Sequence, residues 1–168
     1  MTKVITLGAL LTDTPHTRPT PVTGTSYDTS SAAELRVEPT SYQGPTGIVG
    51  VFQNACVEAG IPAISFWASV PHYVSQARVP KAAVALLHRI EEVLDVEVPL
   101  GALPEQAEEW ERTVSEMAEA DDEVREYVRQ LEEQAEAATD GDDLSKASGD
   151  EIAADFERYL RRRGQGGA

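Results

Sequence analysis

The architecture of this chain follows from residues 44–77, GPTGIVGVFQNACVEAGIPAISFWASVPHYVSQA. This stretch predicts a glycine turn, a helix, a strand and a polar loop. Pro45 suits the first turn of a helix, where its missing N–H leaves no hydrogen bond unmade. Apolar side chains then recur at helical spacing until Gly60 ends the helix. They are Ile48, Val51, Phe52, Cys56 and Ala59.

The residues after this helix predict a buried strand. Ala63–Val70 is apolar apart from two serines. A strand that is apolar on both faces is typical of a parallel sheet with helices on both sides. Val4–Leu11 is a second run of this kind. The sequence therefore predicts an α/β fold, with a mostly parallel sheet flanked by helices.

Helices dominate the rest of the chain. A helix is expected from Val79–Lys81 onward, with apolar side chains on one face. Residues 104–138 consist mostly of helix-forming residues. Their apolar side chains recur at intervals of four and three residues, the heptad pattern that predicts a packed seam between helices. The seam contains Trp110, Val114, Met117, Val124, Val128 and Leu131. Asp121 interrupts it, so we expect a helical hairpin with a break near Ala120.

Composition divides the chain into five segments. They are an α/β core (1–103), an acidic amphipathic helical hairpin (104–138), a linker (139–147), a carboxyl-terminal helix (148–163) and a flexible tail (164–168). Residues 139–146 have no apolar side chain except Leu144. Ser148 and Glu151 match a capping box at the start of the last helix.

The net charge of −15 is unevenly distributed. Residues 104–143 hold 16 acidic and 3 basic side chains, which would repel a phosphate backbone and argue against nucleic-acid binding. The single cysteine, Cys56, fits a reducing cytoplasm, and we interpret it as a small core residue rather than a reactive thiol. No apolar run reaches the length of a membrane span, so no membrane partner is expected.

Glycines recur before the first predicted helix at Gly44, Gly47 and Gly50. Backbone N–H groups at a helix amino terminus can hold an anion, which would make this a phosphate loop that includes Thr46. The loop lacks the Gly-Lys-Ser/Thr of a nucleotide-binding motif. We therefore favour the interpretation that the glycines let the helix pack close to the sheet.

Polar side chains follow both predicted parallel strands. Ligands in open α/β sheets usually bind past the carboxyl ends of strands, so these loops form a candidate crevice. Its residues, together with the glycine loop, are Thr14, His16, Arg18, Gly44, Thr46, Gly47, His72 and Tyr73. The alternative is that these side chains satisfy their own loops and hold a contact between subunits. The sequence shows no nucleophile beside a base and no metal-ligand spacing, so we predict no catalytic residue, cofactor or metal.

Four separated motifs carry a family resemblance. They are TDTPHTRPTPVTGTS (12–26), YQGPTGIVGV (42–51), AGIPAISFWASVPHYV (59–74) and PKAAVALL (80–87). In this order they resemble the carboxyl-terminal half of the proteasome assembly chaperone 2 family. Their sequences are most similar to the actinobacterial branch of that family. The resemblance implies a three-layer fold similar to that of nucleoside phosphorylases. Because family members are much longer, we expect this chain to lack their amino-terminal half and to expose an apolar edge at Val4–Leu11.

The resemblance also bears on partners. It implies a protein partner, with self-association as one possibility. Family members that act on proteasomes often end in a hydrophobic residue, tyrosine and any residue, whereas this chain ends in Gly166-Gly167-Ala168. Docking to a proteasome through the carboxyl terminus is therefore not expected.

Two main function classes remain at this point, and a third, a free acidic coiled-coil adaptor, is less favoured because the seam is short and broken at Asp121. The first is a non-catalytic protein-interaction or assembly-chaperone-like module in the cytoplasm. The second is an enzyme or a binder of a nucleotide or phosphate, with its crevice at His16, Arg18, His72 and Tyr73. The acidic hairpin also allows two interpretations, because it either packs on its own domain or serves as a docking arm. We favour packing for the half that contains Trp110, since leaving this side chain in water would forfeit about 2 kcal/mol.

Overall fold

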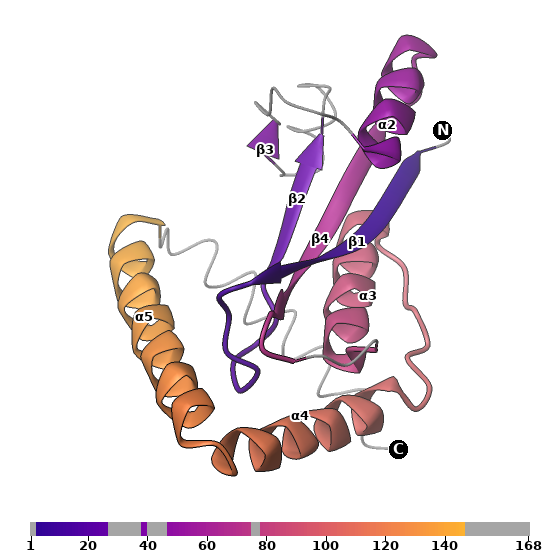
Figure 1. The fold of residues 1–168 in the computed structure, drawn as a ribbon. Helices are drawn as coiled ribbons and strands as arrows, with labels where there is room; N and C mark the ends of the chain where they lie inside the picture. Colours follow the sequence, from indigo (N-terminus) through magenta and orange to yellow (C-terminus); the bar gives the residue numbers. More distant parts are fainter. Residues whose placement is uncertain (1–2, 27–37, 40–46, 75–77, 147–168) are drawn as a thin grey trace. The chain divides into compact units, whose positions relative to one another are not determined.

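The computed structural model describes residues 3–26, 38–39, 47–74 and 78–146. The chain divides into two compact units, Met1–Leu131 and Glu132–Ala168, and the fold below is that of the first unit. The described elements of the chain follow one another in the order β1, β2, β3, α2, β4, α3, α4 and α5, and α5 begins in the first unit and ends in the second (Figure 1).

The strands form one sheet in the order β1-β4-β2-β3. They are β1 (Val4–Thr12), β2 (Val22–Ser26), β3 (Glu38–Pro39) and β4 (Ala63–Pro71). The pairing of β1 with β4 is parallel over the whole length of both strands, and β2 with β3 is also parallel. Between them, β2 pairs antiparallel with β4. The predicted α/β class is confirmed, and its parallel character holds for two of the three pairings.

Alternate side chains of β4 form the core. Ile64 and Phe66 are 1% and 0% exposed and pack against Leu86 of α3 (Pro80–Leu94). Ala68 and Val70, further along the same face of β4, pack against Ala82 of α3. Helix α3 therefore covers this face of the central strand, because its apolar stripe matches the alternation of β4.

Helix α2 (Ile48–Glu58) differs from the expected packing. Its buried residues are Gly50, Gln53 and Cys56, so only Cys56 of the predicted apolar face is buried. Ile48, Val51 and Phe52 are exposed, because the helix turns a different face toward the sheet than its apolar stripe. Ala59 caps the helix and Gly60 follows with a φ of +68°, which agrees with the predicted end. Pro45, Gly44 and Thr46 lie outside the described residues.

A break separates α4 (Leu103–Glu119) from α5 (Asp122–Lys146) at the predicted place. The Oδ1 atom of Asp121 accepts hydrogen bonds from the backbone N–H groups of Glu123, at 2.9 Å, and Val124, at 3.3 Å. Asp121 therefore caps the first turn of α5 instead of occupying a packed seam.

The buried face of α4 also differs from the heptad pattern. Trp110, Val114 and Ala118 are buried, whereas Met117 is 53% exposed. The buried positions advance by four residues at each step, so the prediction for Met117 is wrong and Ala118 takes its place. Trp110 and Val114 pack against Val74, which follows β4. This packing places α4 in the same compact unit as the sheet, beyond the predicted boundary at residue 103.

The expected linker at 139–147 also differs from the structure, because α5 continues to Lys146. This segment contains one glycine and no proline, and a single glycine weakens a helix without breaking it. The predicted carboxyl-terminal helix (148–163) and tail (164–168) lie outside the described residues.

Candidate functional site

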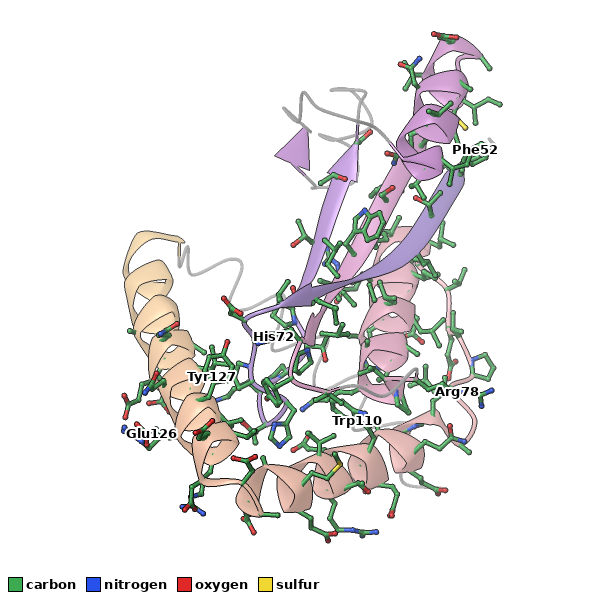
Figure 2. The ribbon with its side chains drawn as sticks, in the orientation of Figure 1. Phe52, His72, Arg78, Trp110, Glu126 and Tyr127 are labelled. Carbon is green, nitrogen blue, oxygen red and sulfur yellow. The ribbon has the colours of Figure 1, made fainter. Side chains whose placement is uncertain are left out.

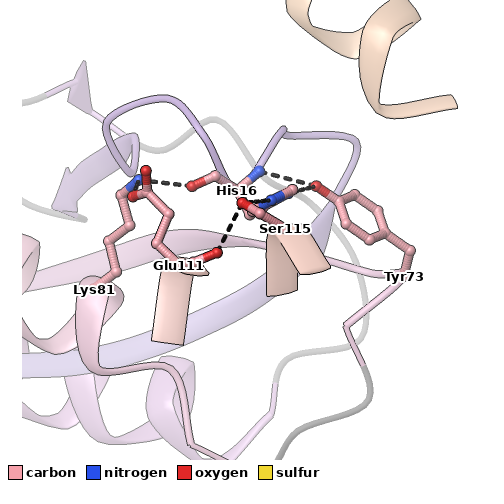
Figure 3. Close-up of polar contacts among 5 residues, drawn as sticks. All are labelled: His16, Tyr73, Lys81, Glu111 and Ser115. Atoms are coloured by element: carbon pink, nitrogen blue, oxygen red, sulfur yellow. Dashed lines mark hydrogen bonds and ion pairs between the residues drawn. The ribbon is translucent and has the colours of Figure 1, made fainter. Parts of the chain in front are cut away.

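The candidate site lies where β1 and β4 end. Because these strands are parallel, their carboxyl ends share one edge of the sheet, and the loop after β1 meets Tyr73, which follows β4. His16 belongs to this loop and is 2% exposed. We define the His16 network as His16, Tyr73, Lys81, Glu111 and Ser115 (Figure 3).

Both ring nitrogens of His16 are engaged inside the protein. Nδ1 lies 2.8 Å from the hydroxyl of Tyr73, and Nε2 lies 3.0 Å from the hydroxyl of Ser115 on α4 (Figure 3). The backbone N–H of His16 also donates to the Tyr73 hydroxyl, at 2.9 Å. These bonds tie the loop to the end of β4 and to α4.

The hydrogen-bond roles define the tautomer of His16. Ser115 uses its hydroxyl hydrogen to donate to the backbone oxygen of Glu111, at 2.9 Å, so it must accept from Nε2–H of His16. In a neutral imidazole, Nδ1 is then an acceptor and receives the hydroxyl hydrogen of Tyr73. In this series of hydrogen bonds, each donor has an acceptor. His16 is therefore placed as a structural link, with neither nitrogen turned to a substrate.

Lys81 connects the same loop to α3 and α4. Its Nζ donates to the backbone oxygen of His16, at 2.6 Å, and forms an ion pair with the carboxylate of Glu111 (Figure 3). The Lys81 side chain is 18% exposed, so this ammonium is partly withdrawn from water. A cation in such a place needs both a charge partner and hydrogen-bond acceptors, and the network supplies them.

A second, more exposed cluster adjoins the network through Tyr73. His72 Nδ1 lies 3.2 Å from Oδ1 of Asp13, and the hydroxyl of Tyr127 on α5 donates to the same oxygen, at 3.0 Å. The ring of Tyr127 meets those of His72 and Tyr73 edge to face, with centroids 5.4 and 5.9 Å apart. The Asp13 and His72 side chains are 76% and 46% exposed, so this cluster is open to solvent.

Two groups near the start of α5 have shifted pKa values. Hydrogen bonds from the side chains of Arg129 and then Gln130 lower the pKa of Glu126 from 4.5 to about 2. Partial removal from water, followed by the hydrogen bond to Asp13, raises the pKa of Tyr127 above 10.0. At neutral pH, Glu126 is therefore ionised and Tyr127 carries its proton.

Only some of the predicted crevice residues lie close together in the structure. His16, His72 and Tyr73 lie together, and Thr14 is buried in the same loop as His16. Arg18 is exposed in this loop. Gly47 precedes α2, and Figure 2 shows Phe52 of α2 toward the other end of the sheet from His72. The structure therefore brings His16, His72 and Tyr73 together, but Gly47 does not lie with them.

The predicted interaction residues on α4 and α5 are mostly inside the protein. Trp110, Val114, Val128 and Leu131 are buried, Val124 is half-buried and Met117 is exposed. The indole N–H of Trp110 is buried and has no acceptor within the described part of the chain. The half of the hairpin that contains Trp110 therefore packs on its own domain, which agrees with the favoured interpretation.

Sequence reasoning missed several site residues, namely Asp13, Lys81, Glu111, Ser115 and Tyr127. The bonds of His16 to Ser115 and Lys81 span 99 and 65 residues. No local spacing links positions so far apart. The only available signal is the position of Lys81 at the start of a helix that follows the strand end.

An open groove of about 470 Å³ lies beside the network, between α3 and α4. Lys81, Glu111, Arg112 and Ser115 contribute to its lining, so its charges are mixed. Lys81 and Arg112 are each paired with a carboxylate, on Glu111 and Glu109. In the part of the chain that the structure describes, no three His, Cys, Asp or Glu side chains are grouped as metal ligands. Nor does any helix there have the length and apolar character required to cross a membrane.

Comparison with known proteins agrees with this fold. The profile of the PAC2 family matches residues 1–118. The crystal structure of a PAC2 family protein from Streptomyces avermitilis is 56% identical, with a TM-score of 0.67, over 74% of this chain and 52% of that one. A Mycobacterium tuberculosis proteasome-assembly chaperone homologue is 61% identical, with a TM-score of 0.64, over 75% and 53%.

A second M. tuberculosis protein, of unknown function, is 29% identical, with a TM-score of 0.74, over 84% of this chain and 48% of that one. No curated protein matches this chain. The chain thus spans about half the length of these solved relatives. The family profile covers well over half of the chain, and two relatives are more than 50% identical to it. The chain therefore belongs to the PAC2 family.

Proposed function

We propose that this chain is a non-catalytic protein-interaction module of the assembly-chaperone kind, acting in the cytoplasm. The observation that carries the proposal is the exposure of apolar side chains on two elements. Leu7, Leu10 and Leu11 of β1 are 47%, 51% and 70% exposed, and we call them the β1 surface. Ile48, Val51 and Phe52 of α2 are 82%, 56% and 48% exposed, and we call them the α2 surface.

Ile48, Val51 and Phe52 recur at helical spacing on one face of α2, and a group of exposed apolar side chains like this favours a protein partner. Single exposed apolar residues are common, but contiguous groups mark places where another macromolecule binds. A M. tuberculosis relative at 61% identity is described as a proteasome-assembly chaperone homologue, which is consistent with a protein partner. Both a second copy of this chain and a different polypeptide satisfy the proposal.

The polar site supports a structural role more than a chemical one. A general base needs a nitrogen or oxygen within reach of a substrate proton. The two ring nitrogens of His16 contact Tyr73 and Ser115 instead, and Lys81 contacts the loop and Glu111. The His16 network therefore acts as a brace that holds the loop, α3 and α4 together.

Crosslinking tests the proposed function. A photoreactive benzoylphenylalanine replaces Phe52 in one variant and Met117 in a matched control. The control position is similarly exposed, at 53%, but lies on α4. Irradiation in cells should give a discrete protein adduct from position 52, and excess unlabelled chain should suppress it. Absence of an adduct at position 52, or equal adducts at both positions, would contradict the proposal.

A second candidate is a binder of a small anion such as phosphate or a nucleotide, at the crevice of His16, Arg18, His72 and Tyr73. A groove that contains Lys81 and Arg112 lies beside the His16 network, although none of the four crevice residues lines it. Its cations already have carboxylate partners, so an anion would have to displace them. Thermal unfolding in inorganic phosphate and in ATP tests this candidate. Saturable stabilisation of the wild type that is lost in Arg18→Ala would support it over the protein-interaction module.

A further inference from the structure

The exposed cluster beside the His16 network joins four side chains from three parts of the fold. Asp13 follows β1, His72 and Tyr73 follow β4, and Tyr127 lies on α5. We call them the Asp13 cluster, and all four belong to the first compact unit. The carboxylate of Asp13 and the ring of His72 are open to solvent, and the His16 network uses neither of them.

The carboxylate of Asp13 has hydrogen-bond donors but no fixed cation beside it. Nδ1 of His72 and the hydroxyl of Tyr127 both contact its Oδ1 atom, at 3.2 and 3.0 Å. A neutral imidazole and a phenol donate hydrogen bonds without adding a positive charge. Among the described residues, no lysine or arginine forms an ion pair with Asp13. The carboxylate is therefore held in position, but its charge is not neutralised by a basic side chain.

The helical segment that carries Tyr127 increases the negative charge of this region. Residues 104–143 contain 16 acidic side chains and three basic ones. The basic ones are Arg112, Arg125 and Arg129, and each forms an ion pair with a carboxylate three residues earlier. An approaching cation is therefore attracted both by this segment and by Asp13.

The three rings of the Asp13 cluster meet at nearly right angles. The angle between ring planes is 81° for His72 and Tyr73, 69° for His72 and Tyr127, and 85° for Tyr73 and Tyr127. Their centroids lie between 5.4 and 6.0 Å apart. Rings arranged in this way can present more than one face to the same small group, and each face carries partial negative charge. A cation within roughly 6 Å of a ring centroid is attracted to that face.

We propose that the Asp13 cluster binds the cationic side chain of a lysine or arginine in a protein partner. The ammonium or guanidinium group donates to the carboxylate of Asp13 and lies against the rings. Figure 2 shows Phe52 of α2 toward the other end of the sheet from His72, so this site is separate from the α2 surface. The proposal thus goes beyond the proposed function, because it gives the protein a second surface, which selects its partner by charge.

Other ligands fit the Asp13 cluster less well. An anion would be repelled by the carboxylate of Asp13. A hard metal ion takes several oxygen ligands, whereas this cluster has a single carboxylate. A small organic cation would bind weakly, because a charge pair that is open to water contributes little by itself. A basic segment of a polypeptide can add further contacts with the acidic residues of α4 and α5.

Peptide selection tests the proposal. A random dodecapeptide library displayed on phage is selected against the immobilised full chain, and the selected peptides are synthesised. We expect them to share at least one lysine or arginine. Each basic residue is then replaced in turn by acetyl-lysine or citrulline, which removes the charge but keeps the length of the side chain. At the position that contacts the cluster, this replacement should weaken binding by roughly tenfold, measured by titration calorimetry.

Matched variants of the protein locate the contact. Asp13→Asn should weaken binding of the charged peptide by roughly tenfold and should remove the difference between the charged and neutral peptides. Glu119→Gln is the control, because it removes one exposed carboxylate from α4 outside the cluster, and it should change the affinity less than about twofold. Tyr127→Leu, which removes a ring, should weaken binding by about two- to fivefold, whereas Tyr127→Phe retains the ring and should bind nearly as the wild type does. Asp13 is 76% exposed, so Asp13→Asn should leave thermal stability unchanged.

Three results would overturn the proposal. Selected peptides without an enriched basic residue would mean that the protein does not select its partner by charge. Equal losses in Asp13→Asn and Glu119→Gln would assign the binding to the general acidity of the surface. Basic peptides that bind Asp13→Asn as tightly as the wild type would place the contact elsewhere. In each of these cases an adduct at position 52 in cells would still support the proposed function, so the two failures are distinguishable.

Discussion

His16 and Tyr73 form two hydrogen bonds with each other, although 57 residues separate them. The Tyr73 hydroxyl accepts from the backbone N–H of His16, at 2.9 Å, and is hydrogen-bonded to its Nδ1, at 2.8 Å. One phenol thus satisfies the main chain and the side chain of a residue that is only 2% exposed. This pair joins the carboxyl ends of β1 and β4, where a ligand would otherwise be expected.

Removal of the Tyr73 hydroxyl should destabilise the protein. Tyr73→Phe removes the two hydrogen bonds between this hydroxyl and buried His16, which should lower the free energy of unfolding by about 2 kcal/mol. Urea denaturation measures the change. Tyr127→Phe is the matched control, because its hydroxyl bonds the exposed Asp13, and it should cost less than about 0.5 kcal/mol. Equal losses in the two variants would argue against the structural role of His16.

Truncation of Trp110 should cost more than any change on the exposed face of α4. Trp110 is 5% exposed and packs with Val74 and Val114, so Trp110→Ala should lower stability by about 3 kcal/mol. Met117→Ala on the same helix should have little effect, since Met117 is 53% exposed. Thermal unfolding of both variants provides the comparison. If Trp110→Ala is as stable as the wild type but loses its partner, α4 is a docking arm.

Gly8 should not tolerate a side chain. A Cβ atom at Gly8 would lie 2.3 Å from the ring of Trp67 on the neighbouring strand, so Gly8→Ala must displace the indole. We expect a loss of about 1–3 kcal/mol and a changed NMR shift for the Trp67 indole N–H. Gly47→Ser is the control, since a Cβ there meets nothing within 4 Å and serine suits a helix N-cap. An unchanged Trp67 signal in Gly8→Ala would contradict the close contact.

The ionisation of Glu126 should depend on Arg129. Its pKa is lowered from 4.5 to about 2, so the stabilisation that it provides is fully present above pH 4.5 and is lost as the pH falls toward 2. Arg129→Ala removes the main cause and should return the pKa toward 4.5. An NMR titration of the Glu126 side chain measures this change. An equally low pKa in Arg129→Ala would mean that another group stabilises the carboxylate.

Local patterns predicted the helices and strands of this chain. The break at Asp121 and the end of α2 near Gly60 depend on residues next to each other, because caps and turns are formed by neighbouring backbone groups. The burial of β4 also follows from its own composition, since a run without charges is stable only under cover on both faces. These features were therefore accessible without coordinates.

The buried faces of the helices were predicted less well. Met117 and Phe52 lie on apolar stripes but are exposed, while Ala118 and Gln53 are buried. An apolar stripe shows which face of a helix would be stabilised by burial. It does not show whether a neighbouring helix or strand packs against that face. The exposed α2 surface marks such a place and would have been assigned to the core from the sequence alone.

The amino-acid sequence by itself determined the α/β class, the family and the interior character of β1, because each of these depends on residue types at short spacing. Only the tertiary structure decided that His16 is a brace and that β1 lies at an edge of the sheet. Both depend on contacts between distant positions, such as His16 with Ser115 across 99 residues. No local pattern contains these contacts, since they arise when the parallel strands β1 and β4 bring their ends together and α4 packs against them.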